Sequence, residues 1–246
     1  MCGTCGCETP EPRRTEVNLH ERILAGNDRQ ATHNREHFRN AGVLALNVMG
    51  SPGAGKTALL EATGRLLAGR RRIGALAGDL ATDHDAQRLS AAGVRARSIT
   101  TGSACHLDAA MVHNALHQLA WNDLNHLFIE NVGNLVCPAV YDLGQAANVV
   151  LLSVTEGEDK PLKYPVMFKA ADLVVITKTD LLEHLPEISL ARIHHSLGQV
   201  MPTPRVIELS ARTGRGVSAW VDWLLSSESQ AAPADVPPRP HSHVHA

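Results

Sequence analysis

The chain has 246 residues, 44% of them hydrophobic and 20% charged, so it can form one large domain with a substantial core. Its 23 basic and 25 acidic residues nearly balance, which excludes a nucleic-acid binder that depends on a basic face. No apolar run approaches the ~18 residues of a membrane-spanning helix, and the first residues lack the apolar stretch of a signal peptide. We therefore expect a cytoplasmic protein that binds neither nucleic acid nor membranes.

The N-terminal segment predicts a tail followed by one helix. Residues 1–15 show no hydrophobic periodicity and are expected to be flexible. Sparse apolar positions over residues 15–39 indicate a weakly amphipathic helix that packs on the surface of the main domain.

Cysteine usage is distinctive in this tail. Three of the five cysteines are Cys2, Cys5 and Cys7, and the other two are Cys105 and Cys137. An odd number with three so close together is not a disulfide framework, and thiols stay reduced in the cytoplasm. Together with fourteen histidines, these thiols indicate a soft or borderline transition metal.

The main domain alternates strand-like and helical segments. Residues 43–49 form a near-continuous apolar run, typical of a buried parallel strand. Further strand-like runs cover residues 73–77, 95–99, 127–130, 149–154, 173–177 and 205–209. The predicted helices cover residues 57–67, 107–121, 190–200 and 217–225. This alternation predicts an α/β fold, with a mostly parallel sheet that has helices on both faces.

A phosphate-binding motif lies at the first junction between strand and helix. The pattern G-x-x-x-x-G-K-[ST] is matched by Gly50, Ser51, Pro52, Gly53, Ala54, Gly55, Lys56 and Thr57. The glycines let backbone N–H groups surround a phosphate at the positive end of the helix. Lys56 is predicted to supply charge to the β- and γ-phosphates, and Thr57 a hydroxyl to Mg²⁺.

Two later elements favour GTP over ATP. The segment Thr177–Asp180 follows an apolar strand and resembles the [NT]-K-x-D element of GTPases. The carboxylate of Asp180 can accept hydrogen bonds from guanine N1–H and N2–H₂, which adenine lacks, and the stem of Lys178 can lie along the base. Ser210 and Ala211 follow another strand, where GTPases contact guanine O6 through a backbone N–H.

Three carboxylates at predicted strand ends are candidates for the catalytic centre. We favour Asp79 and Glu130 over Asp83 as groups that hold Mg²⁺, together with Thr57, or orient the attacking water. With Lys56, Asp79 and Glu130 form the predicted catalytic set. The alternative for each carboxylate is a helix cap or a solvated side chain.

Further segments give the chain a family resemblance. These are Gly102–Asp108, Glu130–Pro138 and Gly157–Pro161, which accompany the terminal cysteines and the phosphate-binding loop. Across roughly residues 1–226 the chain resembles the hydrogenase nickel-incorporation GTPases, the HypB-type hydrogenase maturation factors. The resemblance implies a P-loop GTPase domain of the SIMIBI type.

The same resemblance implies the domain organisation and the activity. We expect a metal-binding tail and helix over 1–40, a GTPase domain over 41–226, and a disordered tail that carries histidines over 227–246. The activity would be that of a GTP-hydrolysing metallochaperone, using Mg²⁺, that helps insert Ni²⁺ into the large subunit of [NiFe]-hydrogenase. A nickel metallochaperone of the HypA type would be a partner.

The resemblance also assigns two metal sites. Cys2, Cys5 and Cys7 form a tight nickel site, and Cys105, His106 and Cys137 form a second site for nickel or zinc. The second site is expected at the interface of a GTP-dependent homodimer. Three thiolates and the α-amino group make a square-planar field that suits Ni²⁺, whereas a closed tetrahedral zinc site would lack a ligand.

Two features depart from the family pattern. Position 177 carries Thr rather than Asn, so a weaker tether to the phosphate-binding loop is expected. The internal histidine tract of some relatives is absent, which speaks against nickel storage, because residues 8–41 hold only His20, His33 and His37. The alternating histidines over residues 241–245 either bind a metal weakly or are solvated.

Three other functions remain as alternatives. The related GTPase that loads urease carries Cys-Pro-His, whereas Cys137-Pro138 is followed here by Ala139. A nickel buffer with a vestigial nucleotide site would not need Lys56 or Asp180. A small-molecule P-loop kinase would need an arginine-rich lid.

Overall fold

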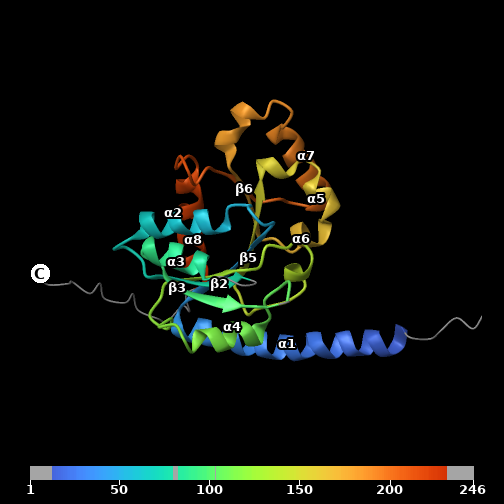
Figure 1. The fold of residues 1–246 in the computed structure, drawn as a ribbon, viewed down its shortest axis with the longest axis vertical. Helices are drawn as coiled ribbons and strands as arrows, with labels where there is room; N and C mark the ends of the chain where they lie inside the picture. Colours follow the sequence, from blue (N-terminus) through green and yellow to red (C-terminus); the bar gives the residue numbers. More distant parts are fainter. Residues whose placement is uncertain (1–12, 80–82, 103, 232–246) are drawn as a thin grey trace, which may run out of the picture.

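The computed structural model describes residues 13–79, 83–102 and 104–231. Seven parallel strands form one sheet in the order β3-β2-β4-β1-β5-β6-β7. They are β1 (Leu44–Gly50), β2 (Ile73–Asp79), β3 (Arg95–Thr100), β4 (His126–Glu130), β5 (Ala147–Ser153), β6 (Leu173–Thr177) and β7 (Val206–Glu208). The predicted α/β fold with a parallel sheet is confirmed (Figure 1).

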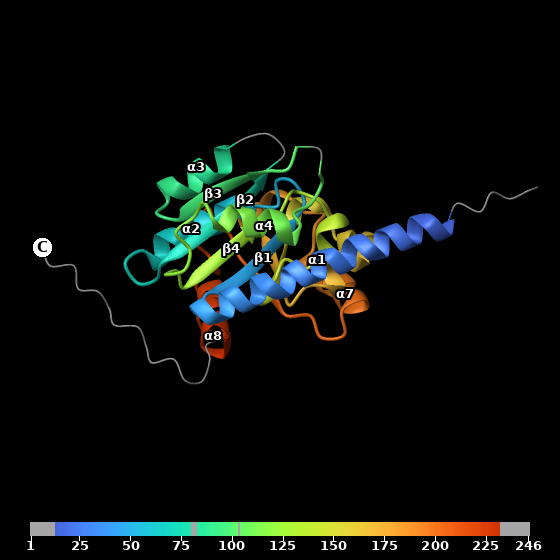
Figure 2. The same cartoon turned by 90° about the horizontal axis from the view of Figure 1, so that it is seen from below.

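Helices cover both faces of this sheet (Figures 1 and 2). The α-helices are α1 (Arg13–Ala41), α2 (Lys56–Leu67), α3 (His84–Ala91), α4 (Ala109–Leu116), α5 (Lys160–Lys163), α6 (Pro165–Lys169), α7 (Leu190–Val200) and α8 (Val217–Ala231). Short 3-10 helices are η1 (Cys137–Ala139), η2 (Val154–Glu156) and η3 (Thr179–His184). None of the helices among the described residues is long and apolar enough to cross a membrane.

The helix boundaries differ from the predicted ones in a few places. The sequence did not predict α5 and α6, which span only four and five residues, too few for a hydrophobic period, or α3, whose eight residues include only two buried ones, Ala86 and Leu89. The helix α4 ends at Leu116, before the predicted residue 121. The last helix, α8, continues past residue 226 to Ala231, so residues 227–231 are helical rather than part of a disordered tail.

The side chains of β1 show why the strand is almost entirely apolar. Successive side chains of a strand point to opposite faces of the sheet. Leu46 and Val48 pack in the core under α2 and α8, whereas Ala45 packs on the α1 and α4 side and Met49 on the α6 and α7 side. Both faces of the strand are therefore buried, and its one polar side chain, Asn47, donates a hydrogen bond to Asn148 Oδ1 at 3.0 Å.

The helix α1 packs on the main domain, as the sequence predicted, and it lies beside α4. Phe38 is buried there, and the buried Asn34 donates hydrogen bonds to the carbonyls of Ala109 and Leu143 at 2.9 and 3.2 Å. Gly144 has φ +88°, and a Cβ there would lie 2.6 Å from the carbonyl oxygen of Ala31. A glycine is therefore required for this close approach.

Candidate nucleotide-binding and metal site

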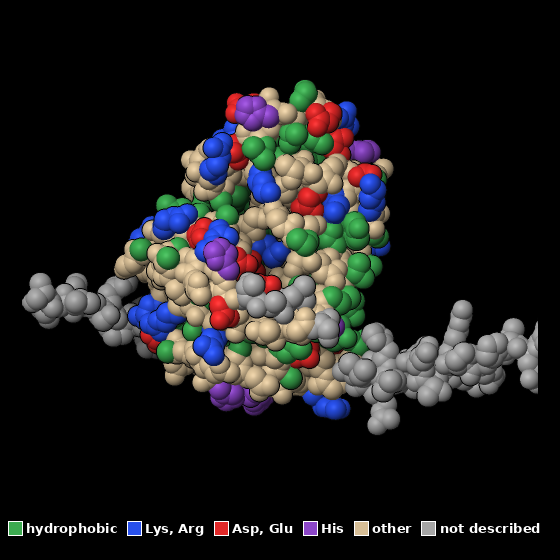
Figure 3. Space-filling view, in the orientation of Figure 1, with side chains coloured by type: hydrophobic (Ala, Val, Ile, Leu, Met, Phe, Trp, Pro, Cys, Tyr) green, Lys and Arg blue, Asp and Glu red, His purple; other side chains and the backbone are tan. Residues whose placement is uncertain are grey.

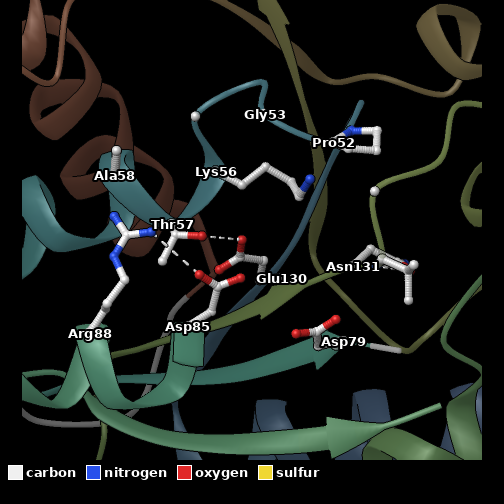
Figure 4. A pocket seen from close by; sticks show the side chains of 14 residues that line it. Pro52, Gly53, Lys56, Thr57, Ala58, Asp79, Asp85, Arg88, Glu130 and Asn131 are labelled. Carbon is white, nitrogen blue, oxygen red and sulfur yellow. Dashed lines mark hydrogen bonds and ion pairs between the residues drawn. The ribbon is translucent and has the colours of Figure 1, made fainter. Parts of the chain in front are cut away.

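The phosphate-binding loop joins β1 to α2 at the carboxyl edge of the sheet. Gly50 has φ +149°, and a Cβ there would lie 2.6 Å from the carbonyl oxygen of Leu151 on β5. Gly55 has φ +94° and precedes α2 without a capping side chain, so the first N–H groups of α2 stay available to a ligand. The loop borders a pocket of about 400 Å³ (Figure 4). Backbone N–H groups and the helix dipole both favour an anion in this pocket.

Lys56 and Thr57 bring polar groups to the same pocket. The ammonium of Lys56 is buried and donates hydrogen bonds to the carbonyls of Gly50 at 3.2 Å and Ser51 at 3.1 Å. Burial lowers the pKa of Lys56, and the negative charge of Glu130 opposes this shift. The hydroxyl of Thr57 donates a hydrogen bond to Glu130 Oε1 at 2.8 Å. The side chains predicted to bind the phosphates and Mg²⁺ therefore line the same pocket.

Glu130 ends β4, directly beside β1, because Val48 pairs with Glu130 in the parallel register. Its side chain is 4% exposed, and Oε2 has no hydrogen-bond partner among the described residues. Burial raises the pKa of Glu130 to about 7, whereas the hydrogen bond from Thr57 and the charge of Lys56 act to lower it. An unpartnered buried carboxylate oxygen that lines the pocket suits a hard divalent cation such as Mg²⁺.

The other two candidate carboxylates differ in position. Asp79 ends β2 and lines the pocket opposite the loop, whereas Asp83 is exposed and is not among the residues that line it (Figure 4). Two further charged residues, Asp85 and Arg88, line the pocket and form an ion pair at 3.4 Å. Neither residue was predicted, because both belong to α3, in which only Ala86 and Leu89 are buried.

A second cavity of about 230 Å³ lies beside the loop, on the other side of Ala58. Lys178 has φ +59°, a left-handed turn that follows β6. It lines the cavity with Asp180, Ser210 and Ala211, as the sequence predicted for a guanine base. A hydrogen bond with Ser210, and another with Arg212 at 2.9 Å, lower the pKa of Asp180. Its carboxylate is therefore ionised at neutral pH, as an acceptor of two N–H groups must be.

Thr177 keeps the tether that the exchange of Asn for Thr was expected to weaken. Thr177 is 3% exposed, and its hydroxyl donates a hydrogen bond of 2.6 Å to the carbonyl of Ala54 in the phosphate-binding loop. A hydroxyl and an amide can both donate to this carbonyl. The loop is thus held to the end of β6, beside the second cavity.

We expect the change Thr177→Val to weaken GTP binding about tenfold, because it leaves the buried carbonyl of Ala54 unpaired at a cost of about 1–3 kcal/mol. Thr177→Ser retains the hydroxyl and serves as the control, which should bind GTP like the original protein. Binding titrations with a fluorescent guanine nucleotide measure both variants. Equal affinities for the valine and serine variants would show that the tether does not shape the loop.

Three predicted metal ligands meet at the same edge of the sheet. Cys105 follows β3, and Cys137 begins η1. Their sulfur atoms lie 3.1 Å apart, and the ligand atoms of Cys105, His106 and Cys137 all lie within 4.8 Å of one another. The His106 ring stacks on Tyr141 with a centroid separation of 3.9 Å, which holds the imidazole in place. Two thiols and one imidazole suit nickel or zinc and leave a fourth coordination position open.

A short loop connects this metal group to the phosphate-binding loop. Asn134 forms a backbone bridge with Gly50, and its side-chain amide donates a hydrogen bond to the carbonyl of Cys105 at 3.2 Å. A Cβ at Gly133 would lie 2.9 Å from the backbone nitrogen of Pro52, so this loop packs tightly on the phosphate-binding loop. Residues 133–134 therefore contact both the phosphate-binding loop and the segment of Cys105. The predicted cysteines of the N-terminal tail, Cys2, Cys5 and Cys7, lie outside the described residues.

Fold and site together define a P-loop nucleotide-binding protein with a GTPase-type fold. The family model described as "CobW/HypB/UreG, nucleotide-binding domain" matches residues 44–208. The chain is 51% identical over 208 residues to the hydrogenase maturation factor HypB of Azotobacter chroococcum mcd 1, covering 85% of this chain and 68% of that protein. It therefore belongs to the HypB family of hydrogenase maturation factors, and the family resemblance of the sequence is confirmed.

Two solved structures of the family are similar to this one. The crystal structure of HypB from Helicobacter pylori in complex with nickel has a TM-score of 0.80 at 38% identity, covering 87% of this chain and 100% of that chain. The structure of HypB from Archaeoglobus fulgidus has a TM-score of 0.77 at 40% identity, covering 83% of this chain and 100% of that chain.

Proposed function

We propose that this protein is a cytoplasmic, GTP-hydrolysing metallochaperone that binds nickel and helps insert it into the large subunit of [NiFe]-hydrogenase. The observation that carries the proposal is the contact between the phosphate-binding loop and the Cys105, His106 and Cys137 group through Asn134. Membership in the HypB family and the nickel complex of the Helicobacter pylori relative support it. A nickel metallochaperone of the HypA type would be its partner.

Hydrolysis of GTP to GDP and phosphate would depend on groups around the first pocket. Lys56 and the N–H groups at the start of α2 would neutralise the charge that grows on the phosphate oxygens. Thr57, Asp79 and Glu130 would hold Mg²⁺, which when bound supplies further neutralising charge to the phosphates. Asp180 and Lys178 would hold the guanine base in the second cavity.

The raised pKa of Glu130 predicts that the Mg²⁺ affinity of this site depends on pH. Its pKa is raised to about 7, so the carboxyl is mostly protonated at pH 6 and mostly ionised at pH 8. Because Mg²⁺ binds the ionised form, the Mg²⁺ affinity of the protein–GDP complex should rise about tenfold from pH 6 to pH 8. Titrations with Mg²⁺ across this range measure it. Glu130→Gln stays neutral and should bind Mg²⁺ weakly at every pH, and an equal pH dependence in this variant would exclude Glu130 as the ligand.

The Cys105, His106 and Cys137 group would bind nickel as cargo, with zinc as the alternative ion. One chain offers two thiolates and one imidazole, so a second copy can complete the coordination in a GTP-dependent homodimer. Val136 and Val140, next to Cys137, are 55% and 45% exposed and provide an apolar surface for such a contact. Cys2, Cys5 and Cys7 would form a separate, tight nickel site in the tail.

Hydrolysis of GTP and of ATP by the full chain, each with and without Ni²⁺, tests the proposed function. We expect GTP to be hydrolysed at least about a hundredfold more efficiently than ATP, because adenine cannot donate to Asp180. Hydrolysis of neither nucleotide would indicate a nickel buffer. Efficient use of ATP with a small-molecule acceptor would indicate a kinase. Either result would refute the proposal.

A further inference from the structure

Four histidines gather on the outer face of α1 and α4, away from the nucleotide pocket. His33 and His37 lie four residues apart on α1, and His113 lies on α4, four residues before His117, which directly follows the end of that helix. Figure 3 shows histidine side chains clustered at the lower edge of the molecule, where Figure 1 places these two helices. Three of the four are exposed and His113 is partly exposed, so a solute can reach them. We call this group the four-histidine cluster.

Within each histidine pair the two Nε2 atoms already lie close together. The Nε2 atoms of His33 and His37 lie 2.9 Å apart, and those of His113 and His117 lie 3.3 Å apart. When two imidazoles bind one cation with metal–nitrogen bonds of ~2.1 Å, the two bound nitrogens lie about 3.0–3.4 Å apart. The lower value belongs to a right nitrogen–metal–nitrogen angle and the higher one to a tetrahedral angle. The spacing of four residues is also the one that places two histidines on the same ion in helical zinc sites.

The two pairs also lie close to each other. The ring of His113 is 5.3 Å from that of His33 and 6.0 Å from that of His37, measured between centroids. With the same metal–nitrogen bond length, two imidazole rings bound to one tetrahedral ion have centroids about 5 Å apart. Small rotations of these side chains therefore bring both pairs to one point, and surface side chains make such rotations within nanoseconds.

The helices that carry the cluster are held rigidly against each other. Asn34, one residue after His33, is buried and donates to the carbonyl of Ala109 at the start of α4. The ring of Trp121 packs edge-on beside His37 at 6.3 Å and beside Phe38 at 5.7 Å. Preorganised ligands bind a metal more tightly, because less conformational entropy is lost.

We propose that the four-histidine cluster is an additional metal site, which binds one divalent transition-metal cation such as Ni²⁺ or Zn²⁺ between α1 and α4. Neutral imidazoles are ligands that these cations favour, and the site contains no thiol. It goes beyond the proposed function, since it shares no residue with the nucleotide pocket or with the Cys105, His106 and Cys137 group. A cation held by both helices stabilises the docking of α1, because it binds the folded state only.

The test compares variants of the full chain that lack one histidine pair. One variant carries His33→Ala and His37→Ala, and another carries His113→Ala and His117→Ala. The matched control carries His184→Ala and His195→Ala, two exposed histidines outside the cluster. Equilibrium dialysis against micromolar Ni²⁺ or Zn²⁺ counts the ions per chain, and thermal unfolding with and without the metal measures stabilisation. The thiol sites are unchanged in all these proteins, so they contribute equally.

We expect the original protein and the control to bind one ion more per chain than either pair variant. We also expect the metal-dependent rise in unfolding temperature to be reduced in both pair variants. Full metal binding by either pair variant would overturn the proposal. A variant that lacks all four histidines should lose one ion per chain, and a loss of two ions would also overturn it. If an alanine variant fails to fold without metal, the single changes His37→Gln and His113→Gln, one on each helix, provide the same comparison.

Discussion

Replacement of Lys56 by alanine should reduce the rate of GTP hydrolysis at least about a thousandfold while the fold is retained. A single preorganised donor to a developing anion contributes a factor of about 10²–10³, and Lys56 adds a full charge in a buried pocket. Its ammonium reaches the pocket from the first turn of α2, within hydrogen-bond distance of the loop carbonyls that surround the phosphate position. No other ammonium among the described residues lines this pocket.

Single-turnover hydrolysis, together with thermal unfolding, measures this effect. Lys169→Ala, an exposed lysine on α6, is the matched control and should hydrolyse GTP at the original rate. A Lys56→Ala variant that unfolds at the original temperature and still hydrolyses GTP within tenfold of the original rate would contradict the assigned phosphate site.

The change Asp180→Asn should weaken GTP binding about fiftyfold and shift the preference toward xanthosine triphosphate. Hydrogen bonds to a charged group contribute about 1.5–3 kcal/mol, and an amide cannot accept both donors of guanine. Xanthine has a carbonyl oxygen where guanine has its amino group, so the amide N–H₂ can donate to it. The loss of the carboxylate also removes the ion pair with Arg212, which is exposed and contributes little to stability.

Competition between GTP and xanthosine triphosphate in the hydrolysis assay measures the change of preference. Glu183→Gln alters a nearby exposed carboxylate and is the control, for which the preference for GTP should persist. An unaltered preference in Asp180→Asn would mean that the second cavity does not bind the base.

The fold could be predicted largely from the sequence, because most of the strands are apolar runs that alternate with helical segments; the edge strand β3, with Arg95 and Arg97, is the exception. The strand β6 has the predicted boundaries, and β1 is displaced by one residue at each end. The helices α3, α5 and α6 could not be predicted, since α5 and α6 span about one turn each and α3 buries only Ala86 and Leu89. The pocket residues Asp85 and Arg88 were missed for that reason.

The site could be predicted where one segment carries a whole motif, as in the loop from Gly50 to Thr57. Contacts between distant segments could be predicted only where the family resemblance implied them, as for Cys105, His106 and Cys137. The contact of Asn134 with Gly50 and Cys105, and the ion pair of Asp180 with Arg212, depend on loops that the sheet brings together. The four-histidine cluster depends in the same way on the docking of α1 beside α4.

The central claim is that the nucleotide state changes the metal site through the Asn134 loop. The nickel affinity of the Cys105, His106 and Cys137 site, measured with a non-hydrolysable GTP analogue, with GDP and without nucleotide, tests it most directly. Serine at positions 2, 5 and 7 removes the tail site from the titration. We expect the affinities with the GTP analogue and GDP to differ at least about fivefold, and nickel to change the affinity for the analogue relative to GDP by the same factor. A nickel affinity that is identical in all three states would contradict the account, even if GTP hydrolysis were normal.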